Sequence, residues 1–282
     1  MVATAMKGTF AMMNFIRNTT AAATAAGLMG CAGVDLSERI PEAQTVRNVV
    51  LVHGAFADGS GWRGVYDELT SRGYRVTMVQ NPLTSFADDV AATRRVIERQ
   101  DGPAILVGHS WGGTIITEAG ADPKIAGLVY VSAISPDAGE NTAQQYVGFT
   151  TPPEFVIDAH ADGFGFLRPS QFKAGFAADA SDADAAFLRD SQVPIALSAF
   201  EAKLSHAAWR TKPSWAVIAT DDKAFDQKML QSMAKRIGAT ITEVPASHAV
   251  FMTRPKEVAD VIDTAARTVS QGAERPAAAA QN

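Results

Sequence analysis

The residues best suited to do chemistry surround Ser110, in the sequence GHSWGG at positions 108–113. An apolar run, Ala104 to Val107, precedes this motif, and a segment with helical character follows it from Thr114. A Gly-x-Ser-x-Gly pattern between a strand and a helix is typical of a sharp turn that lifts the serine hydroxyl off a sheet. Glycines suit such a turn because backbones crowd there, and the helix directs its N-terminal NH groups at the site. The motif predicts that Ser110 is a nucleophile; in the alternative, the serine only caps the helix.

A serine hydroxyl needs a base within hydrogen-bond reach, and the chain has five histidines that could supply it. His248 follows the last predicted strand, in the loop PASH at 245–248. It also comes last in the chain order serine, acid, histidine that is usual for this motif. His109 adjoins the serine and should point away from it, His53 lies in the first loop, and His160 and His206 fall in a predicted cap. We therefore predict that His248 is the general base.

The base needs an acid to orient it, and the loop TDDK at 220–223 follows the preceding predicted strand. Two adjacent aspartates make the choice ambiguous, because neighbouring loop side chains diverge and only one can reach His248. We favour Asp222, and Asp221 is then a solvated or turn-capping residue. Asp137, shortly after the strand predicted at 125–131, is a third candidate.

A serine nucleophile also needs two NH donors that stabilise the oxyanion formed during attack. The amide of Trp111, directly after the serine, is one predicted donor, and the amide of Ala55 in the loop HGAF at 53–56 is the other. For substrate binding we predict the side chains of Phe56, Trp111, Phe164 and Phe166.

Continuous apolar runs rich in β-branched residues predict the strands that position these groups. Such runs are expected for strands buried on both faces of a parallel sheet. Segments with helical periodicity separate them, so the chain predicts a doubly wound α/β sheet with ligands bound beyond the carboxyl ends of the strands. The predicted strands are 48–52, 75–79, 104–107, 125–131, 215–219 and 240–244.

One section, from about 135 to 212, breaks this alternation and contains eight of the fourteen phenylalanines. So many apolar rings are not expected in a solvated loop, so we predict an inserted helical cap over the sheet. Most of the rings are expected to hold the cap in place, and a few to line an apolar substrate pocket. The folded domain is predicted to span residues 47–271.

The two ends of the chain differ from this domain. Residues 1–46 resemble a secretory leader and linker, with Met13 as an alternative start and an alanine-rich stretch before LMGC at 28–31. That ending is similar to a bacterial lipobox, which predicts lipidation of Cys31. The expectation is export to the periplasm, as a secreted or lipid-anchored protein, with a cytoplasmic protein as the alternative. Residues 272–282 are predicted to be a disordered tail.

The overall composition excludes several classes of function. The formal net charge is −5 and the sequence contains no basic run, so nucleic acid is not an expected partner. A single cysteine excludes an intramolecular disulfide and a thiolate metal site. No stretch reaches the roughly 20 apolar residues of a membrane span. We expect neither a metal nor an organic cofactor, and the oligomeric state cannot be read from the sequence.

Taken together, these motifs resemble the α/β-hydrolase superfamily over 49–268. The segment LVHGAFADGSGW at 51–62, the GHSWGG turn, the TDDK loop and the ASHAVF loop at 246–251 are similar to bacterial relatives of the plant hydroxynitrile lyase and methyl-ester esterase branch. The resemblance implies a serine hydrolase with a capped, mostly parallel sheet whose first antiparallel strands are missing or reduced. It also implies Asp222 as acid, His248 as base, and the amides of Ala55 and Trp111 as oxyanion donors.

The expected reaction is cleavage of a small to medium apolar ester through an acyl-enzyme on Ser110, as in a carboxylesterase. Lyases of the same branch carry a lysine directly after the catalytic histidine, whereas Ala249 stands there in this chain. Lyase, C–C bond hydrolase and perhydrolase chemistry with the same triad are the alternatives. A further alternative is a receptor that keeps the fold and binds an apolar ligand without catalysis.

Overall fold

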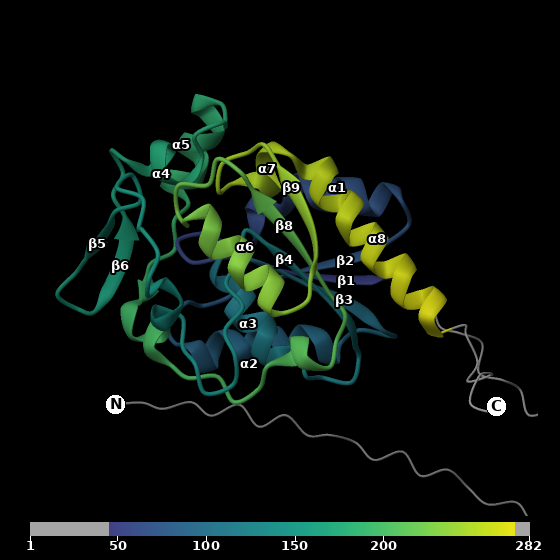
Figure 1. Ribbon diagram of the computed structural model, residues 1–282. Helices are drawn as coiled ribbons and strands as arrows, with labels where there is room; N and C mark the ends of the chain where they lie inside the picture. Colours follow the sequence, from purple (N-terminus) through teal and green to yellow (C-terminus); the bar gives the residue numbers. More distant parts are fainter. Residues whose placement is uncertain (1–44, 274–282) are drawn as a thin grey trace, which may run out of the picture. The chain divides into compact units, whose positions relative to one another are not determined.

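A six-stranded parallel sheet lies at the centre of the computed structural model, which describes residues 45–273 (Figure 1). The spatial order is β2-β1-β3-β4-β8-β9, and every neighbouring pair runs parallel. The predicted doubly wound sheet is therefore confirmed. The strands are β1 (Asn48–Val52), β2 (Arg75–Val79), β3 (Ala104–His109), β4 (Ile125–Val131), β8 (Ser214–Ala219) and β9 (Thr240–Val244).

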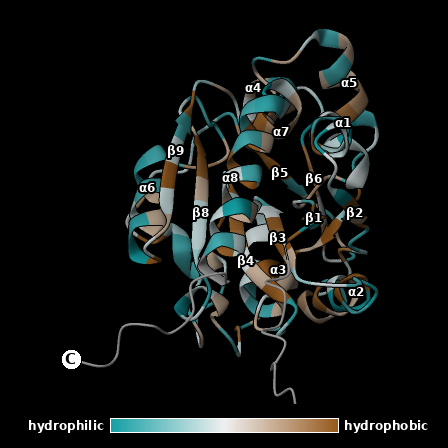
Figure 2. Cartoon of the chain, turned by 90° about the vertical axis from the view of Figure 1, so that its right-hand side faces the viewer, coloured by the Kyte–Doolittle hydropathy of each residue, from teal (hydrophilic) through white to brown (hydrophobic). Residues whose placement is uncertain are grey.

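The inner strands owe their position to continuous apolar sequence. Every residue of β1, β3 and β8 is buried, as expected for strands covered by helices on both faces. The outer strands β2 and β9 are buried less completely. Figure 2 shows apolar residues along the central strands and many hydrophilic residues on the outer helix α8.

Helices cover the sheet on both sides. Helices α1 and α8 pack against each other on one face, α2 and α3 pack together on the other, and α6 contacts β8 (Figure 1). Side chains of Ser85 and Asp226 cap the first turns of α2 and α6, where NH groups lack partners within the helix. The bounds are α1 (Arg63–Ser71), α2 (Phe86–Glu98), α3 (Trp111–Ala119), α6 (Gln227–Arg236), α7 (Val250–Thr253) and α8 (Pro255–Ala273).

The predicted cap contains a small sheet as well as helices. A three-stranded sheet in the order β5-β6-β7 has antiparallel neighbours, and the sequence did not predict it. These strands are two to four residues long, which is too short for a periodic pattern to stand out. The strands and helices of the cap are β5 (Ile157–Ala159), β6 (Phe164–Leu167), α4 (Phe172–Phe176), α5 (Asp182–Asp190) and β7 (Ile195–Ala196). Short 3₁₀ turns lie at 143–146, 197–201 and 208–210.

The first described residues lie against α8, the helix in which the described chain ends. The backbone NH of Val46 donates to Ser270 Oγ at 3.0 Å, and α8 continues two residues beyond the predicted domain end at 271. The predicted leader up to residue 44, including Cys31, and residues 274–282 of the predicted tail lie outside the described residues. Within 45–273, no helix is long and apolar enough to cross a bilayer.

Candidate active site

Ser110 occupies a strained turn between β3 and α3. Its backbone has φ 53° and ψ −120°, a conformation that residues with a side chain rarely adopt. Three backbone hydrogen bonds hold it there: Ser110 NH donates to the carbonyl of Val131, and the NH groups of Gly113 and Ile134 donate to the carbonyl of Ser110. Although Ser110 occupies the N-cap position of α3, its hydroxyl caps no NH group of the helix. The alternative that Ser110 only caps the helix is therefore not supported.

The glycines after Ser110 let the turn pack against neighbouring strands. A Cβ on Gly112 would lie 2.5 Å from the carbonyl oxygen of Val52 at the end of β1. A Cβ on Gly113 would lie 2.3 Å from the carbonyl oxygen of Ile134, beyond the end of β4. Both distances are shorter than any real Cβ contact, so the absence of a side chain is a packing requirement.

His248 and Asp222 form a buried pair at the carboxyl ends of β9 and β8. His248 Nδ1 lies 2.8 Å from Asp222 Oδ2, and both side chains are fully buried. The other carboxylate oxygen, Oδ1, accepts hydrogen bonds from the NH groups of Ala224 (2.7 Å) and Phe225 (3.0 Å). Because both oxygens have partners, the carboxylate is fixed in the orientation that meets the imidazole.

The other two candidate acids lie elsewhere. Asp221 is exposed, and its backbone NH donates to the carbonyl of Ala246. Asp137 pairs with Arg210 at 2.7 Å, with its NH bound to Glu140, so its carboxylate is engaged in a separate cluster. Of the three aspartates, Asp222 alone contacts His248 among the described residues.

The second ring nitrogen of His248 is available for chemistry. With Nδ1 donating to Asp222, Nε2 carries the lone pair of the neutral ring. Nε2 is buried and makes no hydrogen bond to any residue within 45–273, Ser110 included. Hydrogen bonds between a nucleophile and its base are often long before substrate binds. The rings of Phe155, Phe176 and Phe225 surround the imidazole, with centroids 4.9 to 6.2 Å away.

His109 contacts the backbone of His248, a role that the sequence did not predict. Its side chain is buried, and Nε2 lies 2.9 Å from the carbonyl oxygen of His248, which can only accept. Burial is the main cause that lowers the pKa of His109 well below its ordinary value, and the nearby His248 acts in the same direction. The neutral His109 ring thus donates a hydrogen bond that holds the backbone of the base.

The cap also contacts the base loop directly. The NH of Ala249 donates to the carbonyl of Phe176 at 2.9 Å, and the hydroxyl of Ser247 donates to the carboxylate of Asp179. Phe176 and Asp179 both belong to the inserted cap. The position of His248 therefore depends on the cap as well as on β9.

The first loop, which was predicted to supply an oxyanion donor, lies against Ser110. A Cβ on Gly54 would lie 2.8 Å from Ser110 Cβ, so this loop and the turn touch at a glycine. His53 fixes the loop: its Nδ1 donates to the carbonyl of Gly54 at 2.8 Å, and its Nε2 accepts from the NH of Asn81 at 2.9 Å. Burial lowers the pKa of His53, which agrees with the neutral ring that these two bonds require.

A cavity of about 390 Å³ opens next to Ser110. Ala55, Phe56 and Trp111, all predicted from the sequence, line it together with the serine. Most of its wall is apolar, and the remaining lining residues come from the loop after β4, from the cap and from the loop after β8: Ile134, Thr142, Ala143, Tyr146, Phe155, Ile157, Leu197, Phe200, Glu201 and Phe225.

The prediction that Phe164 and Phe166 bind substrate is not supported by their placement, because neither residue lines this cavity. Both lie on the more accessible face of β6, where Phe166 packs against His160, and the alternate residues Gly165 and Leu167 are buried. Phe155 and Phe200 supply the cap rings of the cavity instead. The sequence contains no signal that distinguishes these two from the other cap phenylalanines.

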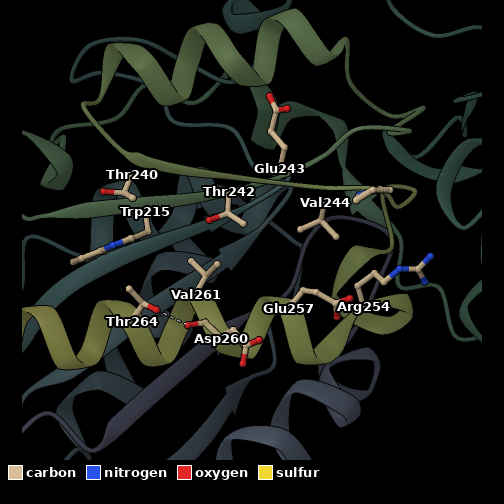
Figure 3. A pocket seen from close by; sticks show the side chains of 11 residues that line it. Trp215, Thr240, Thr242, Glu243, Val244, Arg254, Glu257, Asp260, Val261 and Thr264 are labelled. Carbon is tan, nitrogen blue, oxygen red and sulfur yellow. Dashed lines mark hydrogen bonds between the residues drawn. The ribbon is translucent and has the colours of Figure 1, made fainter.

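A larger hollow, of about 630 Å³, lies between β9 and α8 (Figure 3). Thr242 and Val244 of the strand and Val261 of the helix face one another across it. None of its lining residues is Ser110, Asp222 or His248, so the smaller cavity is the one suited to chemistry. Within 45–273, no three His, Cys, Asp or Glu side chains gather closely enough to hold a metal ion.

Asp89 fixes the side chain of Trp111 through a hydrogen bond to its indole NH. Its fully buried carboxylate accepts hydrogen bonds from the Trp111 indole (Oδ2, 2.8 Å) and from the NH of Leu83 (Oδ1, 2.8 Å). Burial raises the pKa of Asp89 to about 6, and these two hydrogen bonds limit the rise. Leu83 in turn accepts from the NH of Ala196 in the cap strand β7, so Asp89 links turn and cap.

Comparison with known proteins identifies the fold family. A model of the alpha/beta hydrolase family matches residues 49–261, which is most of the chain. The chain belongs to the α/β hydrolase family. The family resemblance expected from GHSWGG and the flanking loops is thereby confirmed, and the parallel six-stranded sheet with its cap is that family's fold.

Relatives of this chain include an esterase and a hydrolase. It is 28% identical over 243 residues to the carbendazim hydrolyzing esterase of Nocardioides sp. (strain SG-4G), covering 76% of this chain and 97% of that protein. It is 26% identical over 254 residues to the pyrethroid hydrolase of Sphingobium wenxiniae, covering 77% and 87%. The solved structure of a pyrethroid hydrolase from Sphingobium faniae JZ-2 has a similar fold, with TM-score 0.68, 21% identity and coverage of 80% and 100%.

We predict that Gly112→Ala destabilises the fold, because its Cβ would collide with the carbonyl of Val52. The expected loss is about 1–3 kcal/mol in the free energy of unfolding, the usual cost of overpacking. Gly102→Ala is the matched control, since its Cβ would meet its nearest atom, Asn48 Nδ2, at 3.6 Å. Urea denaturation followed by circular dichroism measures both; equal stability of the two variants would contradict the packing argument.

We predict that Asp89 makes folding stability fall as the pH rises from about 4 to 6. Its pKa is raised in the folded state, so the folded protein binds the proton more tightly and stability is lost as that proton leaves. Two pKa units correspond to about 3 kcal/mol at most.

The measurement is denaturant unfolding of the wild type and Asp89→Asn at several pH values. The difference between their unfolding free energies should change by up to about 3 kcal/mol across this range. Asp88→Asn is the control, because the pKa of the exposed Asp88 is lowered by hydrogen bonds from Ser85 and Thr84. Parallel curves for wild type and Asp89→Asn would overturn the assignment.

Proposed function

We propose that the protein is a serine carboxylesterase, with Ser110 as nucleophile, His248 as general base and Asp222 as the acid that orients it. The observation that carries the proposal is the buried Asp222–His248 pair, at 2.8 Å, at the same sheet edge as the strained serine turn. An adjoining apolar cavity supplies a place for substrate. The relatives named esterase and hydrolase support ester cleavage as the reaction.

In the first half of the reaction, Ser110 Oγ attacks the ester carbonyl carbon while His248 Nε2 takes the hydroxyl proton. Asp222, held by two NH groups, stabilises the imidazolium that forms. The amides of Ala55 and Trp111 donate to the oxyanion, and these residues flank the serine in the cavity. When the carbon–oxygen bond breaks, His248 returns the proton to the departing alcohol.

In the second half, water attacks the acyl-enzyme and gives its proton to His248. The bond between the acyl carbon and Ser110 Oγ then breaks, Oγ recovers the proton and the carboxylic acid leaves. All proton transfers pass through one nitrogen, Nε2, which is the ring nitrogen left free by Asp222. The burial of this nitrogen strengthens its interaction with charges formed nearby.

The size and lining of the cavity favour small to medium apolar esters. A volume of about 390 Å³ lies at the lower end of the range of small-molecule sites. Aromatic rings of Phe56, Phe155 and Phe200 supply flat apolar surface for an acyl or alcohol group.

We predict that Ser110→Ala lowers kcat for p-nitrophenyl esters by at least about a thousandfold, because no other group can form the acyl-enzyme. The measurement is hydrolysis of a series from acetate to decanoate, in which the cavity size favours the shorter chains. A fluorophosphonate probe should label the wild type and leave Ser110→Ala unlabelled. Substantial turnover by Ser110→Ala would exclude the serine mechanism, and a wild type that resists the probe would favour a non-catalytic receptor.

We predict that Asp222→Asn and Asp221→Asn have very different effects on kcat. Loss of the carboxylate at 222 should lower kcat by about 10⁴, because the imidazole loses its orientation and charge partner. Asp221→Asn should stay within about twofold of wild type, since its side chain is exposed and only its backbone is bound. Kinetics on p-nitrophenyl butyrate decide the matter; a comparable loss in both variants would contradict Asp222 as the sole acid.

A further inference from the structure

Glu201 introduces a negative charge into an otherwise neutral cavity. Of the residues that line the cavity in the described part of the chain, Glu201 alone has an ionisable carboxylate or any other formally charged side chain. It ends the 3₁₀ turn 197–201 in the cap, and Leu197 and Phe200 of the same turn also line the cavity. The Phe200 ring packs edge-on against Trp111, the residue after the serine, at 5.3 Å between centroids. Glu201 is therefore adjacent in sequence to a cap residue that touches the reactive turn.

Neutral groups hold Glu201 in place. Asn141 Nδ2 donates to the Glu201 carbonyl at 3.2 Å and lies 3.4 Å from its carboxylate oxygen Oε2. Asn141 is buried and is itself fixed by two hydrogen bonds with Gln144. Within residues 45–273, no Lys, Arg or His nitrogen lies within 4.0 Å of the Glu201 carboxylate. Its charge is not balanced by a neighbouring cation of the described chain.

The rest of the wall suits the same kind of ligand. Besides Ser110 and Trp111, whose indole NH is bound to Asp89, the polar side chains of the rest of the lining are those of Thr142, whose hydroxyl bonds to Thr114 at 2.8 Å, and Tyr146. The faces of aromatic rings carry partial negative charge and attract cations when a ligand is withdrawn from water. Phe200, the neighbour of Glu201 in the chain, and Trp111, against which it packs, add two such rings to the cavity lining. An apolar body with a positive charge near one end matches this wall.

We propose that the substrate is an ester whose apolar acyl or alcohol group carries a cationic nitrogen, and that Glu201 selects for that charge. This inference rests on the proposed esterase function and names its substrate class. Because Glu201 is exposed and lines the cavity without a hydrogen bond to Ser110, Asp222 or His248 of the described chain, it acts on binding and not on the reacting atoms. Its effect therefore falls on KM.

Two esters of the same shape test the proposal: the p-nitrophenyl esters of 4-(trimethylammonio)butyric acid and of 5,5-dimethylhexanoic acid. They differ only in a positively charged nitrogen that replaces a carbon atom. Wild type should favour the cationic ester by up to about fivefold in kcat/KM, the upper size of one exposed ion pair, because a quaternary ammonium donates no hydrogen bond. Glu201→Gln should bring this ratio to about one through a higher KM for the cationic ester.

Glu257→Gln is the matched control, because it also removes one exposed carboxylate but lies in the groove between β9 and α8. It should keep the wild-type preference, which would show that a local charge and not net charge sets the selectivity. An equal ratio in wild type and Glu201→Gln would overturn the proposal.

Binding separates this inference from the esterase proposal. In a Ser110→Ala background, calorimetry with the methyl esters of the two acids should give up to about fivefold tighter binding of the cationic ester. The added change Glu201→Gln should remove that difference. If neither p-nitrophenyl ester is hydrolysed but this binding difference holds, the esterase function fails and the role of Glu201 stands. If esters are hydrolysed and the binding difference is absent, the role of Glu201 fails alone.

Discussion

The unusual backbone conformation at Ser110 is the constraint on which the rest of the site depends. A positive φ on a residue with a side chain costs about 1–3 kcal/mol, so the surrounding structure must stabilise it. Hydrogen bonds to Val131, Gly113 and Ile134 do so, and two glycines let β1 and the loop after β4 approach. The turn is therefore held from three places: Val131 at the end of β4, Gly113 in the first turn of α3, and Ile134 in the loop after β4.

The base is stabilised in a different way. Its imidazole is enclosed by aromatic rings, and its carboxylate partner has hydrogen bonds at both oxygens. Burial of such a pair is costly unless nearly every polar atom is satisfied. Here one atom is not, Nε2 of His248, and it is the atom that a proton transfer requires. The neutral His109 donates to the backbone carbonyl of the same residue.

The sheet and the serine motif could be predicted from sequence because their signals are local. Continuous apolar runs and the spacing of glycines around Ser110 reflect contacts that each segment must make. The choice between Asp221 and Asp222 needed the structure, since it depends on which way one loop turns. Asp89, Glu201 and the cap rings also escaped prediction, because their surroundings come from segments distant in sequence. Phe164 and Phe166 failed for the same reason: composition identified a cap rich in rings but not the face each ring occupies.

The attachment of the cap has a consequence for how new specificities arise in this chain. Ala249 is bound to Phe176, Ser247 to Asp179, and Leu83 to Ala196, so the insert is fastened both to the loop of the base and to the loop above Asp89. A foreign cap grafted onto this sheet would have to reproduce these three contacts before its own pocket could determine which substrate binds. Substitutions of the cap residues that line the cavity leave these contacts intact. Adaptation to new substrates is therefore easier by substitution of residues in that cavity wall than by exchange of the whole insert.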